Sequence, residues 1–319
     1  MATKSQMGER QPKAGKLWLK WVRIGVGLLV GLPVALLGFY LSLNRTNGKL
    51  TSGGERRAYL LYVPPSYDPA TPTPLVISIH GFAEWPAHQM QISHWNDLAD
   101  EYGFLVVYPS GTGLPWRWRI GGPAPSPDVT FISDLIDHLA ETYTIDLNRV
   151  YANGLSNGGG MSYVLACQLS DRITAVGSVS GAYLLPLAQC NPTRTVPVIA
   201  FHGTDDPIVP FTGGPSGSFD YDFPVIPDWM AQWAAHNACE SPPLDLPAQG
   251  SVTGVHYPHC GGSTTFTFYT IHGGGHSWPG GDAMPEAIVG HTTQDVDVTR
   301  LMWEFFQQYT LTGKNLSTD

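Results

Sequence analysis

The sequence predicts an α/β protein with a doubly wound, mostly parallel sheet, preceded by one N-terminal transmembrane helix. Three observations lead to this prediction. From Arg57 onward, short apolar runs alternate with amphipathic helical stretches, as in folds whose helices cover both faces of a sheet. Most of these runs lack polar alternation, which is typical of strands buried on both faces. A charge-free apolar segment, Ile24–Leu43, precedes them.

The first predicted element is the transmembrane helix Ile24–Leu43. Its sequence, IGVGLLVGLPVALLGFYLSL, has the length of about twenty apolar residues that crosses a bilayer as a helix. The positive-inside rule keeps residues 1–23 in the cytoplasm as a short basic tail and places the rest of the chain outside it. The basic residues of that tail nearest the helix are Lys13, Lys16, Lys20 and Arg23.

A cleaved signal peptide is the alternative for this segment, and it would give a secreted protein. Signal peptides have a shorter apolar core and a small-x-small cleavage site, whereas this segment ends in FYLSLNR. A buried core helix would need a polar face, which the segment lacks. We therefore expect an extracytoplasmic protein that is anchored to the membrane.

The rest of the chain divides into a stalk, one large domain and a tail. Residues 44–56 are rich in Asn, Thr, Ser and Gly and predict a flexible stalk. Residues 57–312 form the predicted domain, and residues 313–319 a short tail. The predicted strands of the domain are Tyr59–Val63, Leu75–Ile79, Leu105–Tyr108, Val150–Asn153, Ala175–Val179, Val198–His202 and Thr265–Ile271.

Three amphipathic stretches between and after these strands predict helices, at Asp128–Tyr143, Asn157–Gln168 and Val296–Tyr309. Two Pro- or Gly-rich insertions, Gly213–Pro224 and Glu240–His259, predict long loops that shape a cleft.

Charge and cysteine content narrow the class of protein. The formal net charge is −9, which argues against a nucleic-acid partner because the chain would not neutralise the phosphates.

Four cysteines in a translocated domain permit disulfides. Cys239 and Cys260 bracket a Pro-rich excursion, so we expect them to pair, with two buried thiols as the alternative. Cys167 and Cys190 are a second candidate pair.

The segment Gly154–Gly158 (GLSNG) matches the G-x-S-x-G elbow that carries a nucleophilic serine between a strand and a helix. The serine of such an elbow adopts a strained backbone conformation, and side chains two residues away on either side would clash. A predicted strand precedes Ser156 and a predicted helix follows it, so Ser156 is the predicted nucleophile. An ordinary loop serine is the alternative.

An oxyanion hole requires two N–H groups beside the nucleophile. The backbone N–H of Asn157 lies at the start of the predicted helix and is the first candidate. The second is Phe82, which follows the strand Leu75–Ile79 and the pair His80-Gly81. The alternative for His80-Gly81 is an ordinary turn at the strand end.

On this fold the catalytic acid and base follow the serine in the order Ser, acid, His. Asp206 follows a strand within GTDDPIVP and is the predicted acid, whereas Asp205 more plausibly caps the turn. His276 in GHSWPG is the predicted base, because His272 lies too close to its strand. A metal site formed by His202, Asp205, Asp206 and His276 would leave the serine elbow unexplained, so the prediction includes no metal and no cofactor.

Five tryptophans lie in or beside predicted loops near the active edge of the sheet: Trp85, Trp116, Trp118, Trp229 and Trp278. Tryptophan rings that flank a cleft suit aromatic acyl groups or sugar rings, although several could pack under the loops. Trp278, two residues after His276, is the one predicted to line the substrate cleft. No linker or adhesive module is evident, so we expect soluble esters or short oligomers to be preferred over crystalline polymer.

The stretches LVISIHGF, SPDVTFISDLIDHLAETYTIDLNRVYANGLSNGGGMSYVLACQLSD, VPVIAFHGTDDPIVPF, NACESP and IHGGGHSWPG resemble the secreted poly(3-hydroxybutyrate) depolymerase and feruloyl esterase family, related to carbohydrate esterase family 1. The resemblance implies an α/β-hydrolase fold with Ser156, Asp206 and His276 as the catalytic triad. The chain departs from the family pattern in its N-terminal anchor and in Gly160, where larger residues are commoner.

The resemblance and the residues together predict a serine carboxylic-ester hydrolase that acts on a small or oligomeric ester through an acyl-enzyme. Two alternatives stay open at this point. A prolyl-oligopeptidase-like serine peptidase shares the fold and the triad, and a catalytically inactive hydrolase could serve as an anchored binding module.

Overall fold

The computed structural model describes residues 34, 36–39, 41–121, 125–217 and 219–314. The chain divides into two units, Met1–Asn44 and Arg45–Asp319. In the first unit, the described residues between 34 and 43 are helical. The predicted transmembrane segment Ile24–Leu43 lies mostly outside the described residues. Within the part of the chain that is described, no helix is both long and apolar enough to cross a membrane.

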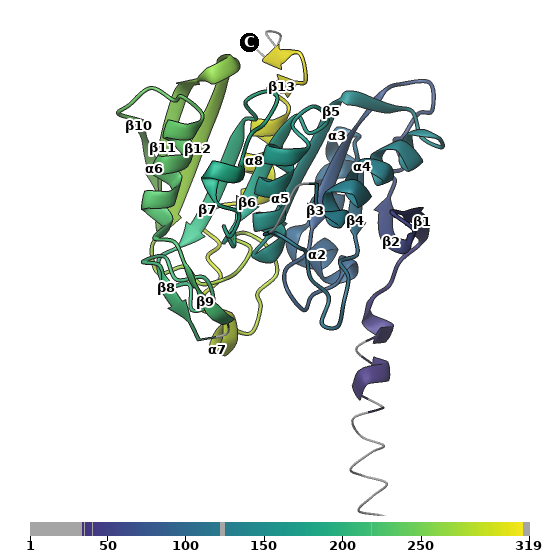
Figure 1. Ribbon diagram of the computed structural model, residues 1–319, viewed down its shortest axis with the longest axis horizontal. Coiled ribbons are helices and arrows are strands. Elements are labelled where there is room, and N and C mark those ends of the chain that lie inside the picture. The colour runs from purple at the N-terminus through teal and green to yellow at the C-terminus, as the bar shows by residue number, and fades with distance from the viewer. Residues whose placement is uncertain (1–33, 35, 40, 122–124, 218, 315–319) are drawn as a thin grey trace, which may run out of the picture. The chain divides into compact units, whose positions relative to one another are not determined.

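The second unit is built on a ten-stranded sheet with the strand order β1-β2-β4-β3-β5-β6-β7-β12-β11-β10 (Figure 1). The six central strands from β4 to β12 run parallel to one another, and the two strands at each edge pair antiparallel. The strands are β1 (Gly48–Ser52), β2 (Glu55–Tyr62), β3 (Thr73–Ile79), β4 (Leu105–Pro109), β5 (Ile145–Leu155), β6 (Ala175–Val179), β7 (Val198–Gly203), β10 (Leu244–Gln249), β11 (Val252–Cys260) and β12 (Thr264–Ile271).

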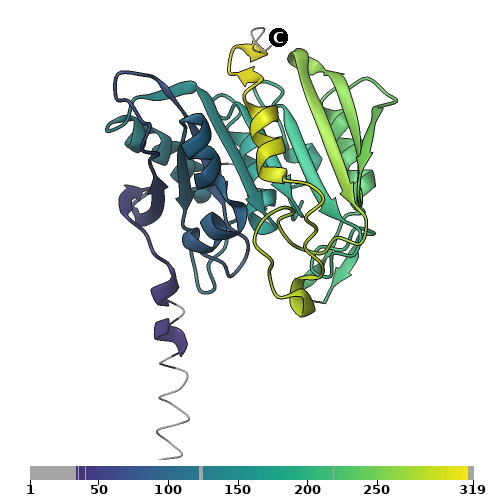
Figure 2. The same ribbon diagram turned by 180° about the vertical axis from the view of Figure 1, so that it is seen from behind.

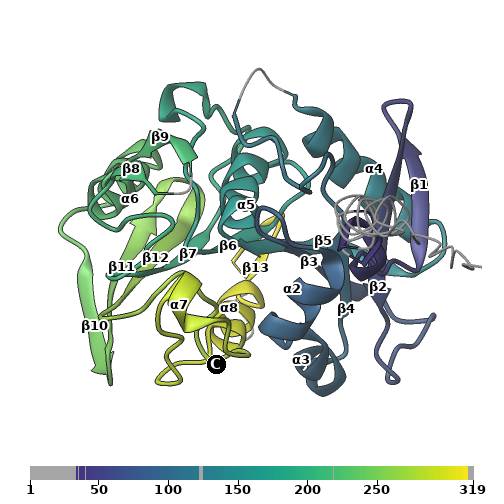
Figure 3. The ribbon, with the colours of Figure 1, turned by 90° about the horizontal axis from the view of Figure 1, so that it is seen from below.

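Helices cover both faces of this sheet. One face carries α4 (Pro127–Ala140), α5 (Asn157–Gln168) and α6 (Ile226–His236), which lie in front of the sheet in Figure 1. The other face carries α2 (Pro86–Ser93), α3 (Trp95–Tyr102) and α8 (Val298–Phe306), which are seen from behind in Figure 2. Figure 3 shows the three layers end on.

Two hydrophobic cores result from this arrangement, one on each face. All seven residues of β3 are buried, and its side chains alternate between the cores, with Leu75 and Ile77 in one and Val76 in the other. A strand that is apolar on both faces stays buried only in the middle of such a sandwich. The unbroken apolar runs in the sequence therefore correspond to the central strands, and the doubly wound prediction is confirmed.

The structure corrects the predicted stalk. Residues 48–52 form β1, which pairs with β2 through the hairpin at Gly53-Gly54. Both glycines have positive φ, 56° and 83°, as a two-residue hairpin turn demands. Residues 48–56 thus belong to the sheet.

The two insertions that were expected to be long loops contain strands. The first holds the hairpin of β8 (Gly214–Ser216) and β9 (Phe219–Phe223). The second holds β10 and most of β11, which extend the sheet at its edge. Sequence patterning also missed α2, α3 and α6, because each is short and begins near a proline or a tight turn. The remaining elements are η1 (Leu187–Gln189), η2 (Gly261–Ser263), α7 (Glu286–Val289), β13 (Tyr309–Thr310) and β14 (Gly313–Lys314).

Two disulfides link helices to neighbouring segments. Cys239, just after α6, bonds to Cys260 at the end of β11. Cys167 in α5 bonds to Cys190 after the short helix η1. The segment that Cys239 and Cys260 close contains the β10–β11 hairpin, with a register shift between Leu246 and Gln249, and is not the unstructured excursion that the sequence suggested.

Candidate active site

Ser156 lies at the sharp turn between β5 and α5 in the backbone conformation φ 57°, ψ −118°. A side-chain-bearing residue rarely adopts positive φ, and such strain concentrates at functional sites. Its N–H donates to the carbonyl of Val179 at 2.9 Å, which ties the turn to the adjacent strand β6. The side chain is 7% exposed, and it opens into a cavity described below.

The glycines of the elbow are required by close packing. A Cβ on Gly154 would lie 2.5 Å from the carbonyl carbon of Gly158 and 2.6 Å from the carbonyl oxygen of Ile79. A Cβ on Gly158 would lie 2.7 Å from the carbonyl oxygen of His80. These contacts are shorter than real Cβ atoms tolerate, so the strand can turn into the helix only with glycine at both positions.

Gly160, where the sequence departs from the family pattern, is also sterically fixed. A Cβ there would collide with the carbonyl oxygen of Ala182 and approach Ile120 Cδ1 to 2.9 Å. The segment after β6 packs directly against the first turn of α5, and the N–H of Ala182 donates to the Ser156 carbonyl at 3.0 Å. A larger residue would push this segment away from the elbow.

His276 and Asp206 form a buried pair near Ser156. His276 Nδ1 and Asp206 Oδ2 are 2.7 Å apart, and the two residues are 4% and 5% exposed. His276 stands in the loop after β12, and Asp206 follows β7, so neighbouring parallel strands deliver both to the same sheet edge. Both residues, like Ser156, were predicted from the sequence, and the structure brings all three to one place.

Asp206 is held by three separate hydrogen-bond donors. Its Oδ1 accepts from the N–H groups of Ile208 and Val209, each at 2.8 Å, while Oδ2 faces His276. Burial alone would raise the pKa of Asp206, but the facing His276 and these donors lower it below its ordinary value. The carboxylate therefore stays ionised and fixes the tautomer of His276, with the Nδ1 proton toward Asp206.

The neighbouring Asp205 has a different environment. It is exposed, and its carboxylate accepts from the hydroxyl of Thr204. Its N–H donates to the carbonyl of Gly274 at 3.0 Å, which joins the two loops that carry Asp206 and His276. Asp205 thus helps to shape the turn, as expected, while Asp206 faces the histidine.

His202 lies behind this pair without forming a metal site. It is fully buried, and its Nε2 donates to the carbonyl of Val209 at 2.9 Å and lies 3.5 Å from Asp206 Oδ2. Burial lowers the pKa of His202, so the ring is neutral. Among the described residues, no group of three or more His, Cys, Asp or Glu side chains could hold a metal ion.

A cavity of about 280 Å³ opens beside Ser156 and His276. Its remaining wall is mostly apolar and includes the T-shaped pair Phe82–Phe219, with ring centroids 5.3 Å apart. Phe219 belongs to β9, and the helix α7 contributes Ile288 and Val289; β8, β9 and α7 lie together at the lower edge in Figure 1. The other lining residues are Gly81, Glu84, Ile208 and Met284.

The loop after β3 carries the second predicted oxyanion donor, Phe82. His80 fixes the start of this loop from inside the protein: Nδ1 contacts the Gly81 carbonyl at 2.7 Å, and Nε2 accepts from the Gly111 N–H at 3.0 Å. Burial lowers the pKa of His80 to about 4, so the ring is neutral. Within the described part of the chain, no hydrogen bond engages the N–H of Phe82 or that of Asn157, which leaves both donors available to a ligand.

The prediction that Trp278 lines the substrate cleft is wrong. Trp278 is fully buried in the core on the face of α8, and its Nε1 donates to Thr299 Oγ1 at 2.8 Å. Trp118 is also buried and donates to the carbonyl of His80. None of the five loop tryptophans lines the cavity. Proximity in sequence to His276 did not reveal that the loop turns this side chain inward.

Glu84 was not singled out from the sequence, yet it lines the same cavity. Its Oε2 accepts the Gly81 N–H at 2.8 Å, and its Oε1 lies 3.6 Å from His88 Nδ1. Nothing in the local pattern marks this residue, because its position depends on how the loop after β3 folds back over Ser156.

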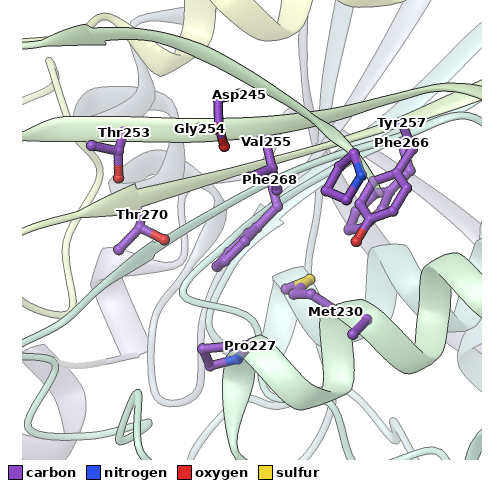
Figure 4. Close-up of a pocket in the computed structure, with 12 residues that line it drawn as sticks. Pro227, Met230, Asp245, Thr253, Gly254, Val255, Tyr257, Phe266, Phe268 and Thr270 are labelled. Carbon is purple, nitrogen blue, oxygen red and sulfur yellow. The ribbon is translucent and has the colours of Figure 1, made fainter. Parts of the chain in front are cut away.

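A second cavity of about 320 Å³ lies between α6 and the strands β10–β12 (Figure 4). Its wall includes Met230, Tyr257, Phe266 and Phe268. It contains none of the predicted site residues, so we assign the reaction to the cavity at Ser156.

An α/β sheet with a serine at the strand–helix elbow and a His–Asp pair beside it defines the class of serine hydrolases with the α/β-hydrolase fold. Residues 57–191 match the family described as Esterase PHB depolymerase. This match covers less than half of the chain and supports its assignment as a carboxylic-ester hydrolase.

Similar proteins agree with this class. A stretch of 157 residues, 49% of this chain, is 36% identical to a bifunctional acetylxylan esterase/xylanase of Neocallimastix patriciarum, but covers only 22% of that enzyme. Feruloyl esterase C of Emericella nidulans is 27% identical, with 82% of this chain and 87% of the relative covered. The putative esterase NocK of Nocardia uniformis is 28% identical, with 82% of each chain covered.

A solved structure supports the fold. The acetyl xylan esterase from Aspergillus awamori superimposes with a TM-score of 0.60 and 16% identity. The match covers 81% of this chain and 98% of that structure.

Proposed function

We propose that the chain hydrolyses soluble esters of bulky apolar acyl groups, through an acyl-enzyme formed on Ser156. The observation that carries this proposal is the mostly apolar cavity that contains both Ser156 and His276. Esters with aromatic acyl groups, such as feruloyl esters, are the first candidates, since one relative is named a feruloyl esterase and two phenylalanine rings stand in the cavity wall.

In the proposed mechanism, His276 removes the Ser156 proton as the serine oxygen attacks the ester carbonyl. The N–H groups of Phe82 and Asn157 stabilise the oxyanion, a contribution worth several kcal/mol in such sites. His276 then protonates the leaving alcohol and later activates water, which releases the acid from Ser156. Asp206 stabilises the imidazolium and keeps it oriented throughout.

The substrate proposal is tested by comparing kcat/KM for 4-nitrophenyl ferulate, 4-nitrophenyl acetate and a soluble hydroxybutyrate oligomer with clearing of a crystalline polymer suspension. Because a larger apolar acyl group buries more surface in the cavity, we expect the feruloyl ester to exceed the acetyl ester by about tenfold. The crystalline polymer should be the slowest. A preference for acetyl esters, rapid polymer clearing, or cleavage of aminoacyl amides would contradict the proposal.

We also propose that the N-terminal segment anchors the protein to a membrane, with the esterase unit on the extracytoplasmic side. The proposal rests on the charge-free run Ile24–Leu43. It is supported by the apolar side chains of Val34, Leu36, Leu37, Phe39 and Leu41, which are at least 43% exposed.

The anchor is tested by fractionation of cells that express the full chain. The chain should sediment with membranes and resist extraction by carbonate, whereas a variant that begins at Arg45 should be soluble and active. A mature protein whose first residue lies beyond about residue 40 would show cleavage of a signal peptide instead.

A further inference from the structure

Among the described residues that line the cavity beside Ser156, Glu84 is the only one with a carboxylate side chain. Its side chain is 15% exposed, and the described lining residues include no Lys or Arg. The other wall side chains are apolar except for Ser156 and His276. The cavity therefore carries a negative charge without a permanently charged partner in its wall.

Glu84 lies close to the reacting atoms. A Cβ built on Gly81 would be 2.9 Å from Glu84 Oε2 and 3.4 Å from Ser156 Cβ, so the carboxylate and the nucleophile flank the same glycine. The 2.8 Å hydrogen bond from the Gly81 N–H holds Oε2 at this place. A charged group of a ligand bound at Ser156 would therefore interact strongly with the Glu84 carboxylate, because little water would separate the two.

The groups around Glu84 keep it ionised. Burial would raise the pKa of Glu84, but the nearby His88 imidazole and the Gly81 N–H lower it below its ordinary value. His80 carries no charge near neutral pH, since burial lowers its pKa to about 4. His88 is the remaining neighbour that can become a cation, and its Nδ1 is 3.6 Å from Oε1. Burial opposes protonation of His88, but the Glu84 carboxylate raises the pKa of His88 above its ordinary value. The pair therefore carries a net negative charge only at a pH high enough for His88 to lose its proton.

We propose that Glu84 is a specificity-determining residue that makes the cavity repel anions, so that neutral esters enter while esters bearing a carboxylate, and the carboxylate product, are disfavoured. Ester hydrolysis turns a neutral substrate into an acid that ionises at neutral pH. A fixed negative charge beside Ser156 thus acts against product binding and not against substrate binding. This inference rests on the proposed ester hydrolysis at Ser156.

The test uses two substrates that differ in charge at one end: 4-nitrophenyl hexanoate and mono-4-nitrophenyl adipate, in which a carboxylate replaces the terminal methyl. Initial rates are measured at about pH 8, where carboxylates are ionised, with spontaneous hydrolysis subtracted. The variant Glu84→Gln keeps an oxygen that can accept the Gly81 N–H and removes only the charge. Glu84→Asp keeps the charge, and Glu286→Gln removes an exposed carboxylate from α7 outside the cavity wall.

In Glu84→Gln, we expect kcat/KM for the adipate ester to rise about tenfold relative to that for the hexanoate ester. The inhibition constant of hexanoate should fall by a similar factor. Glu84→Asp and Glu286→Gln should keep the wild-type ratio, and added salt should weaken the discrimination in the wild type.

An unchanged ratio in Glu84→Gln, or an equal loss on both esters, would overturn the inference and leave Glu84 with only a positioning role. The proposed function is judged separately, by whether the wild-type protein cleaves the hexanoate ester at all. A wild type that cleaves neither ester would contradict both.

Discussion

Asp205 and Asp206 are adjacent in the sequence but occupy opposite environments. Asp206 is buried against His276 and receives two backbone N–H donors, whereas Asp205 is exposed and contacts Thr204. The order of the triad and the turn after β7 were enough to predict which carboxylate faces the histidine. The role of each is decided by burial, which the sequence pattern alone does not give.

Substitution of the two aspartates separates their roles. Asp206→Asn should lower kcat roughly 10⁴-fold, because an amide no longer holds His276 in the catalytic tautomer. Asp205→Asn should change kcat by less than about threefold, as expected of a surface carboxylate. Steady-state kinetics with 4-nitrophenyl hexanoate measures both, and thermal unfolding checks that each variant is folded. If Asp205→Asn is the inactive variant, the acid is wrongly assigned.

Trp278 and Glu84 are two loop residues whose side-chain positions could not be predicted from the sequence. The sequence placed Trp278 in the cleft because it follows His276 closely, but the loop turns the ring into the core against Thr299. Glu84 carries no motif, and only the fold of its loop brings it beside Ser156. Side-chain direction in irregular loops depends on tertiary packing, which short motifs do not encode.

At the scale of elements, the loop after β3 depends on one buried histidine. The neutral ring of His80 accepts the N–H of Gly111 through Nε2, and the backbone carbonyl of His80 accepts from Trp118 Nε1. Because its pKa is lowered from an ordinary value of 6.5 to about 4 in the folded protein, the unfolded chain binds the proton first as pH falls. The contribution of the neutral His80 ring to the free energy of unfolding is therefore present above about pH 6.5 and is lost progressively toward pH 4.

This linkage predicts that His80 contributes about 3 kcal/mol to the loss of unfolding free energy between pH 7 and pH 4. His80→Gln should be less stable at pH 7 but should show a flatter pH dependence, since the titrating ring is gone. Urea unfolding at several pH values measures the slope, with the exposed His259 changed to Gln as the control. Equal slopes in the wild type and His80→Gln would refute the role of His80.

The sequence predicted the central strands well and the edges poorly. Strands such as β3 and β7 are apolar on both faces, and this signal survives without tertiary information. The edge strand β10 is largely exposed, so its residues resemble a loop. The hairpin at Gly53-Gly54 did carry a turn signal, but the polar residues of β1 favoured a flexible stalk instead.

At the scale of the whole esterase unit, the parallel strands bring distant segments to one sheet edge. The serine follows β5, the acid follows β7 and the base follows β12, and these parallel strands end at the same edge of the sheet, with β6 between β5 and β7. The topology explains why three short motifs, read in order, predicted three residues that the fold brings together, Ser156, Asp206 and His276. The shape of the cavity could not be predicted, because residues of β9 and α7 form part of its wall.

The central claim is that Ser156 is the nucleophile of an ester hydrolase. The most direct test is to locate the covalent adduct after treatment of the full chain with a fluorophosphonate. Intact-mass and peptide analysis should show one adduct, on Ser156. The variant Ser156→Ala should take up no label and hydrolyse no ester, while its thermal unfolding stays close to that of the wild type. Labelling at another residue, or ester turnover by a folded Ser156→Ala protein, would contradict the account.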